Sequence, residues 1–255
     1  MMHDILLILS WLAPLAIALT LIGATRFAWK AMPLAGLPGL AAALLVPAGS
    51  MVELPAILIG TRFGLDQVGG VFLLFTTVIW TLAGWHSLGY ITSRKRSFCL
   101  FFLLAMTGNI GLVLAQDMVG FYLFFALMSF ASYGLVVHDR TQQVFHAGKV
   151  YIILVVLGEV LIFSGMTGVA SFSGSISFTE IGGGWGEGWW GVLLFGALMV
   201  GFGIKAGALP LHVWLPLAHP AAPVPARPTR CSLPMFEAKR EAPITNQPAL
   251  RPARK

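Results

Sequence analysis

Seven long apolar stretches, almost free of charged side chains, constrain this chain more than any other feature of its sequence. Each approaches or exceeds the roughly 20 residues with which an α-helix crosses the bilayer core. Only Glu159 and Lys205 place an acidic or basic side chain inside one of them. The stretches are residues 5–24, 31–50, 68–91, 98–116, 118–138, 150–172 and 189–209.

Composition supports the same fold class. Charged residues make up 10% of the chain and hydrophobic residues 57%, whereas a soluble domain carries about 25% charged residues. We therefore expect an all-α membrane protein with about seven transmembrane helices. Prolines make the second stretch the least regular, and Pro210 predicts that the seventh helix is broken near that residue.

The segments between the stretches alternate in charge. The loops after the first, third and fifth stretches hold seven basic residues, and the opposite loops are acidic apart from Arg62. The positive-inside rule then places these basic loops in the cytoplasm and the N-terminus outside. We expect the first stretch to be retained, because it lacks the features of a cleaved signal peptide. The basic residues are Arg26, Lys30, Arg94, Lys95, Arg96, Arg140 and Lys149.

The net charge of +6 does not indicate nucleic-acid binding, because residues 227–255 supply most of it, with seven basic and two acidic residues. Cys99 and Cys231 support neither a disulfide framework nor a zinc site. We expect no metal, no cofactor and no covalent catalysis. His138 and His146 flank a basic loop and are expected to be solvated.

Glu159 and Lys205 are the candidates for chemistry, since a charge inside the bilayer costs a few kcal/mol and is usually functional. Two structural alternatives stay open. Glu159 can hold neighbouring helices together as a protonated carboxyl, and Lys205 can extend its ammonium to the interface. His212 and His219 follow the break and complete a candidate proton relay.

Helix lengths predict that the two charged residues lie at different depths in the membrane. At 1.5 Å per residue, Lys205 lies about 24 Å from the outer end of its stretch and Glu159 about 14 Å from the inner end of its own. In a core about 30 Å thick their depths differ by around 8 Å. A direct ion pair therefore requires the helices to tilt or shift.

The motif "KAGALPLHVWLPLAHPAAPVPA" at residues 205–226 resembles the signature of the antiporter-like, proton-conducting membrane subunits of respiratory complex I and Mrp antiporters. "SYGLVVHDR" and "LGEVLIF" point to the hydrogenase-4 component B/formate hydrogenlyase subunit 3 branch. The resemblance covers about residues 1–226. It implies the N-terminal half of a fold of about fourteen helices with two inverted repeats, in a bacterial-type inner membrane.

The resemblance assigns Lys205 and Glu159 to a proton relay. It also exposes two departures. The family commonly has a glutamate where this chain has Ala126, and the Pro- and Arg-rich residues 227–255 replace the expected continuation. We expect that tail to be disordered and to result from a frameshift or truncation. The alternative is a basic arm that touches anionic lipid.

These observations predict a proton-translocating subunit of a hydrogenase-4, formate hydrogenlyase or NADH-quinone oxidoreductase-type complex, truncated as written. Its partners are other membrane subunits, lipid and protons, with no nucleic acid. The alternatives are a non-conducting membrane scaffold and a stand-alone sodium/proton antiporter.

Overall fold

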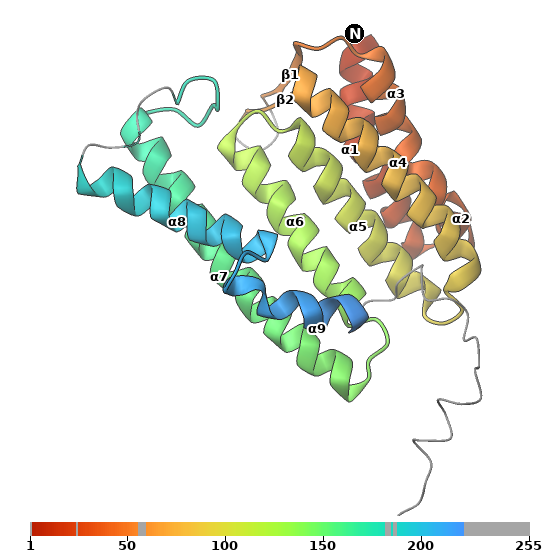
Figure 1. Cartoon of the computed structure of the whole chain (residues 1–255). Coiled ribbons are helices and arrows are strands. Elements are labelled where there is room, and N and C mark those ends of the chain that lie inside the picture. The colour runs from red at the N-terminus through yellow and green to blue at the C-terminus, as the bar shows by residue number, and fades with distance from the viewer. Residues whose placement is uncertain (1, 24, 56–59, 182–184, 186–187, 222–255) are drawn as a thin grey trace, which may run out of the picture. The chain divides into compact units, whose positions relative to one another are not determined.

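The computed structural model describes residues 2–23, 25–55, 60–181, 185 and 188–221. Seven of the described segments are helical, long and apolar enough to cross a membrane, which confirms the predicted number. The boundary at residue 226 and the tail lie outside the described residues. Figure 1 shows the elements. They are α1 (Met2–Leu19), η1 (Thr20–Ile22), α2 (Thr25–Ala31), η2 (Met32–Gly36), α3 (Leu37–Leu45), β1 (Ser50–Leu54), β2 (Thr61–Leu65), α4 (Gln67–Tyr90), α5 (Lys95–Leu114), α6 (Met118–Val136), α7 (Gln142–Ser173), α8 (Trp189–Ala206), η3 (Leu211–Val213) and α9 (Trp214–Ala221).

Prolines interrupt the regular helix of the second span, as expected. Pro33 lies at the start of η2 and Pro38 at the start of α3. Proline lacks a backbone N–H and is tolerated at the first turn of a helix, where no intrahelical acceptor is needed. The span is therefore built from two short α-helices joined by a 3₁₀ turn.

Short polar side chains start three of the long helices. Asp66, Asp117 and Thr141 accept backbone N–H groups of the first turn of α4, α6 and α7, respectively. Such caps satisfy donors that the helix itself cannot pair. Asp117 also accepts the backbone N–H of Arg62 at 2.8 Å and is 1% exposed. It is therefore a buried link between α6 and β2 rather than a solvated loop charge.

An antiparallel hairpin, β1–β2, lies between the second and third spans and was not expected from the sequence. Its register places Glu53 opposite Arg62, and Arg62 Nε lies 2.9 Å from the Glu53 carboxylate. Phe63 turns inward and stacks on Trp11 of α1, with ring centroids 5.4 Å apart. The hairpin is thus anchored to the helices by both charge and aromatic packing.

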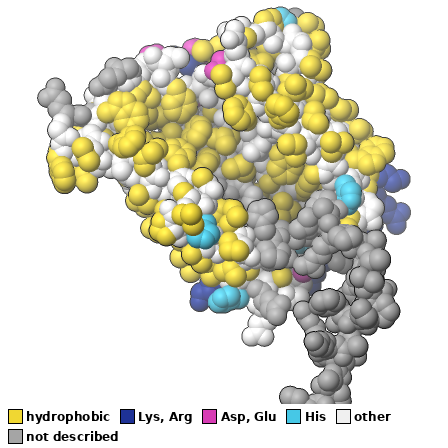
Figure 2. All heavy atoms as spheres, viewed as in Figure 1, with side chains coloured by type: hydrophobic (Ala, Val, Ile, Leu, Met, Phe, Trp, Pro, Cys, Tyr) yellow, Lys and Arg dark blue, Asp and Glu magenta, His cyan; other side chains and the backbone are white. Residues whose placement is uncertain are grey.

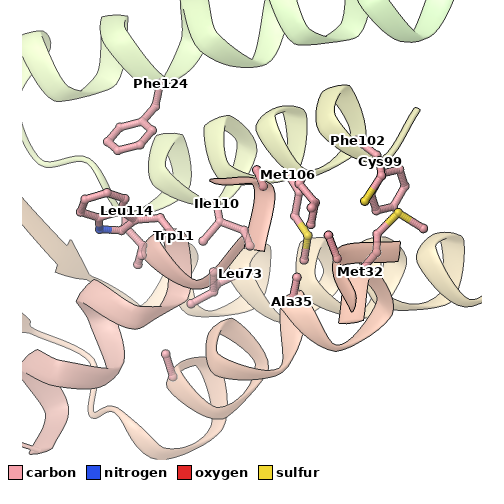
Figure 3. Packing of buried hydrophobic residues seen from close by; sticks show 14 of the residues in the cluster. Trp11, Met32, Ala35, Leu73, Cys99, Phe102, Met106, Ile110, Leu114 and Phe124 are labelled. Carbon is pink, nitrogen blue, oxygen red and sulfur yellow. The ribbon is translucent and has the colours of Figure 1, made fainter. Parts of the chain in front are cut away.

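The first five spans share one core. Its side chains come from α1, η2, α4 and α5, and Phe124 of α6 closes it against Trp11 (Figure 3). A second core joins α6, α7 and α8 through Phe125, Ile162 and Leu198. A third, smaller cluster packs α9 against the C-terminal end of α6 and the first half of α7.

The outer surface of these helices is apolar. Figure 2 shows hydrophobic side chains over most of the visible face, with Lys and Arg mainly at its right and lower edges. Large hydrophobic residues are exposed along α4, α7 and α8. Lipid tails cover such a surface in a membrane, so the chain is a multi-pass membrane protein.

Candidate functional site

A buried ion pair joins the two charges that the sequence places inside apolar spans. Nζ of Lys205, in the last turn of α8, lies 2.8 Å from Oε1 of Glu159 on α7. Their side chains are 14% and 4% exposed, respectively. The contact lacks hydrogen-bond alignment, and Oε2 of Glu159 has no hydrogen-bond partner in the described part of the chain. A buried carboxylate oxygen without a donor is costly, which favours a functional role over packing.

This direct contact corrects the depth estimate from helix lengths. That estimate treated the helices as upright rods, but α8 crosses α7 obliquely (Figure 1). Gly158 and Gly201 meet at the crossing, where a Cβ on Gly158 would lie 3.2 Å from the Gly201 carbonyl oxygen. Glycine on both helices lets the backbones approach closely. Glu159 and Lys205 flank this crossing, so their side chains meet.

Two residues of α6 complete the surroundings of the Lys205 ammonium. Nζ donates a hydrogen bond to Oγ of Ser129, and it lies 4.7 Å from the centroid of the Phe125 ring. Phe125 and Ser129 are four residues apart and therefore share a helix face. Sequence reasoning missed both. The available signal was a pair of serines, Ser129 and Ser132, in a largely apolar span, since such hydroxyls often bond across helices.

The seventh span breaks where the sequence predicts. Helix α8 ends just before Gly207, whose φ of +68° suits glycine at a helix C-terminus. Pro210 follows in a cis peptide bond with Leu209. Trp214 of α9 donates its indole N–H to the Ile204 carbonyl at 2.7 Å, tying the two halves of the span together.

The histidines of the predicted relay are not joined to the ion pair. His212 lies in η3, half-buried, and its Nδ1 has no hydrogen-bond partner among the described residues. No hydrogen bond or ion pair connects it with Lys205 or Glu159 within that part of the chain. His219 lies in α9, and its side chain is outside the described part. The relay roles of both histidines stay predictions.

An apolar cavity of about 280 Å³ lies behind the Phe125 ring. Phe121 and Phe202 line it and pack against Phe125, with centroid separations of 5.7 and 5.9 Å. All of its lining side chains are hydrophobic, and they extend as far as Trp185 in the loop after α7. A cavity of this kind offers water no hydrogen-bond partners.

A second charged cluster lies outside the spans. Arg62 Nη1 is 3.3 Å from the carboxylate of Glu180, which also accepts the hydroxyl of Ser175 at 2.6 Å. The Ser175 hydroxyl, followed by the Arg62 guanidinium, lowers the pKa of Glu180. This cluster connects the hairpin to the loop after α7. We therefore assign it a structural role, because its ion pair and hydrogen bond hold the two segments together.

His138 is buried, which contradicts the expectation of a solvated side chain. It is 5% exposed, and Phe98 of α5 packs edge-on against its ring at 5.6 Å. Burial lowers the pKa of His138, so the neutral imidazole is favoured in the folded chain. His146, in contrast, is exposed as expected.

The described residues include no cluster of three or more His, Cys, Asp or Glu side chains that could hold a metal ion. Lys205, Glu159 and Ser129 converge within the described spans. Their chemistry suits proton exchange rather than metal binding, since one of the three is an ammonium.

Comparisons with known proteins identify the same region. The family described as "NADH:quinone oxidoreductase/Mrp antiporter, TM" matches residues 115–227. Hydrogenase-4 component B of Escherichia coli is 27% identical over 168 residues, covering 62% of this chain and 24% of that protein. The chain is therefore similar to antiporter-like membrane subunits.

Another relative is an uncharacterized protein of Mycobacterium tuberculosis. It is 34% identical over 171 residues, which are 65% of this chain and 26% of the relative. The chain thus spans about a quarter of the length of these curated relatives.

Solved structures share the fold of this chain. The archaeal membrane-bound sulfane sulfur reductase superposes with a TM-score of 0.74 at 16% identity, over 88% of this chain and 48% of that one. The Mrp complex of Dietzia gives 0.73 at 21% identity, over 87% and 44%. Ser129, Glu159 and Lys205 all lie within the family-matched segment.

Proposed function

We propose that this chain is a proton-translocating membrane subunit in which Lys205 and Glu159 form the proton relay. The observation that carries the proposal is the buried ion pair, 2.8 Å long, at the break of the seventh span. Intramembrane charges are expensive, and they mark ion pathways in membrane proteins.

The chemistry of the pair suits this role. A proton that passes from the ammonium to the carboxylate converts two opposite charges into a neutral amine and a neutral carboxyl. This transfer leaves the net charge unchanged, so it avoids placing an isolated charge in the bilayer. The carboxyl then holds the proton on a buried oxygen that has no hydrogen-bond partner among the described residues, so its release requires an acceptor beyond them.

The membrane complex and orientation are part of the proposal. The named relatives and neighbours include a hydrogenase-4 component, an Mrp complex and an archaeal respiratory membrane complex. We infer that this chain likewise assembles with other membrane subunits of a redox-linked complex in a bacterial-type cell membrane. The seven basic loop residues support an outer N-terminus.

The test uses the full chain in proteoliposomes that contain a pH-sensitive dye. A potassium diffusion potential drives protons inward, and the rate of acidification is measured with and without a sodium gradient. We expect Lys205→Ala to reduce the rate at least tenfold. Lys149→Ala, which removes an exposed lysine of α7, should keep the wild-type rate.

Each alternative gives a different result. Equal rates in wild-type and Lys205→Ala liposomes, with both proteins correctly inserted, refute conduction through Lys205 and leave the scaffold role. Acidification that requires the sodium gradient identifies a stand-alone sodium/proton antiporter.

A further inference from the structure

Ser129 lies against the ion pair and has no role in the sequence-based relay. It is 2% exposed, in the middle of α6. Its Oγ donates to the carbonyl oxygen of Phe125 at 2.7 Å and accepts a hydrogen bond from Nζ of Lys205. The hydroxyl proton of Ser129 is thus used in the hydrogen bond to the helix backbone, and a lone pair of Oγ faces the Lys205 ammonium.

Three groups surround the ammonium of Lys205 in this arrangement. It has three N–H donors and three acceptors around it: the Glu159 carboxylate at 2.8 Å, the Ser129 hydroxyl and the face of the Phe125 ring at 4.7 Å. Aromatic faces attract cations within about 6 Å. The charged form is therefore stabilised by three neighbouring groups, two of them supplied by α6.

We propose that Ser129 is a positioning residue that holds Nζ of Lys205 against Glu159 and follows its protonation by rotating its hydroxyl. This inference rests on the proposed relay function of Lys205. When Lys205 loses its proton, its nitrogen presents a lone pair instead of a donor. The hydroxyl then leaves the Phe125 carbonyl and donates to that lone pair.

The rotation breaks no obligatory bond. The Phe125 carbonyl keeps its α-helical hydrogen bond from the backbone N–H four residues later, so it is not left unpaired. Serine hydroxyls have one rotatable donor and two acceptor lone pairs, which suit both states of the amine. An alanine at this position supplies neither.

A matched control lies one turn further along α6. Ser132 donates its hydroxyl to the Met128 carbonyl at 2.7 Å, the same backbone bond that Ser129 makes. No hydrogen bond joins Ser132 to Lys205 among the described residues. Ser132→Ala thus removes a similar hydroxyl from the same helix without touching the pair.

The experiment is an infrared pH titration of the full chain in lipid. The protonated carboxyl band of Glu159 is assigned by its loss in Glu159→Gln, and its titration midpoint reports on the coupled pair. We expect Ser129→Ala to shift the midpoint by about half to one pH unit, since the bond to the ammonium is charge-assisted and therefore stronger than the bond to the neutral amine. Ser129→Thr, which keeps the hydroxyl, and Ser132→Ala should retain the wild-type midpoint.

Two results overturn the proposal: an unchanged midpoint in Ser129→Ala, or an equal shift in Ser132→Ala. Proton flux is measured on the same variants in proteoliposomes. If the wild-type chain carries no protons while the Ser129→Ala midpoint still moves, the transport function fails and the positioning role stands.

Discussion

The crossing of α7 and α8 gives a sharp prediction, because a single methyl group should disturb it. A Cβ added at Gly201 would lie 2.7 Å from Cγ1 of Ile162 and 3.0 Å from the carbonyl oxygen of Gly158. Carbon contacts are normally about 3.5 to 4.0 Å. The carbonyl belongs to a helix backbone and cannot move aside alone, so α8 must move away from α7.

The magnitude follows from a matched pair of variants. Gly196, also in α8, has nothing within 4 Å of an added Cβ. Gly201→Ala and Gly196→Ala gain the same helix propensity, so their difference isolates overpacking, which costs about 1–3 kcal/mol. For a chain of this size we expect a thermal midpoint about 2–12 °C lower in Gly201→Ala.

Thermal unfolding in detergent, followed by circular dichroism, measures this difference. Proton flux should also fall in Gly201→Ala, because the separation of the helices lengthens the 2.8 Å contact between Lys205 and Glu159. A Gly201→Ala variant that is as stable and as active as Gly196→Ala refutes the close-packed crossing as the origin of the ion pair.

Further predictions concern charge. The lowered pKa of Glu180 means that its contribution to stability is present above the unfolded-state pKa and is lost as pH falls through the folded value. Glu180→Gln should therefore reduce the loss of thermal stability between pH 6 and 3, as should removal of Arg62. The lowered pKa of His138 means that the unfolded chain binds a proton more readily. Acidification from pH 7.5 to 5.5 should thus lower the thermal midpoint, and His138→Gln should flatten that dependence. Glu159→Ala leaves a buried ammonium unpaired and should cost about 3–5 kcal/mol. The additional change Lys205→Met should restore most of that loss in chemical denaturation, and a double variant no more stable than Glu159→Ala contradicts the buried pair.

Hydropathy was sufficient to predict the spans, because a bilayer core requires long apolar helices and penalises nearly every charge. The break near Pro210 was also predictable, since proline removes a backbone donor. The β1–β2 hairpin was not, because its pairing depends on Phe63 meeting Trp11 of a distant helix. Residues near the hairpin in the sequence give no indication of this long-range contact.

The candidate site was predictable in part. Lys205 and Glu159 are conspicuous because they are charges in apolar stretches, but their distance depends on how the two helices cross. Counting residues along each helix could not supply that crossing. Ser129 escaped notice because a serine is inexpensive in a span, and only the packed structure shows its lone pair facing the ammonium.

The apolar cavity behind Phe125 has an electrical consequence for a relay at Lys205. Lys205 lies in the last turn of α8, next to the break, whereas the cavity extends through wholly hydrophobic walls to Trp185, beyond the first residue of α8. A membrane voltage falls mainly across the medium of low dielectric constant, here the cavity side. A proton that leaves Lys205 in that direction crosses most of the field, at up to about 2.3 kcal/mol per 100 mV. Loading from the break should therefore be nearly insensitive to voltage, and release across the cavity strongly dependent on it.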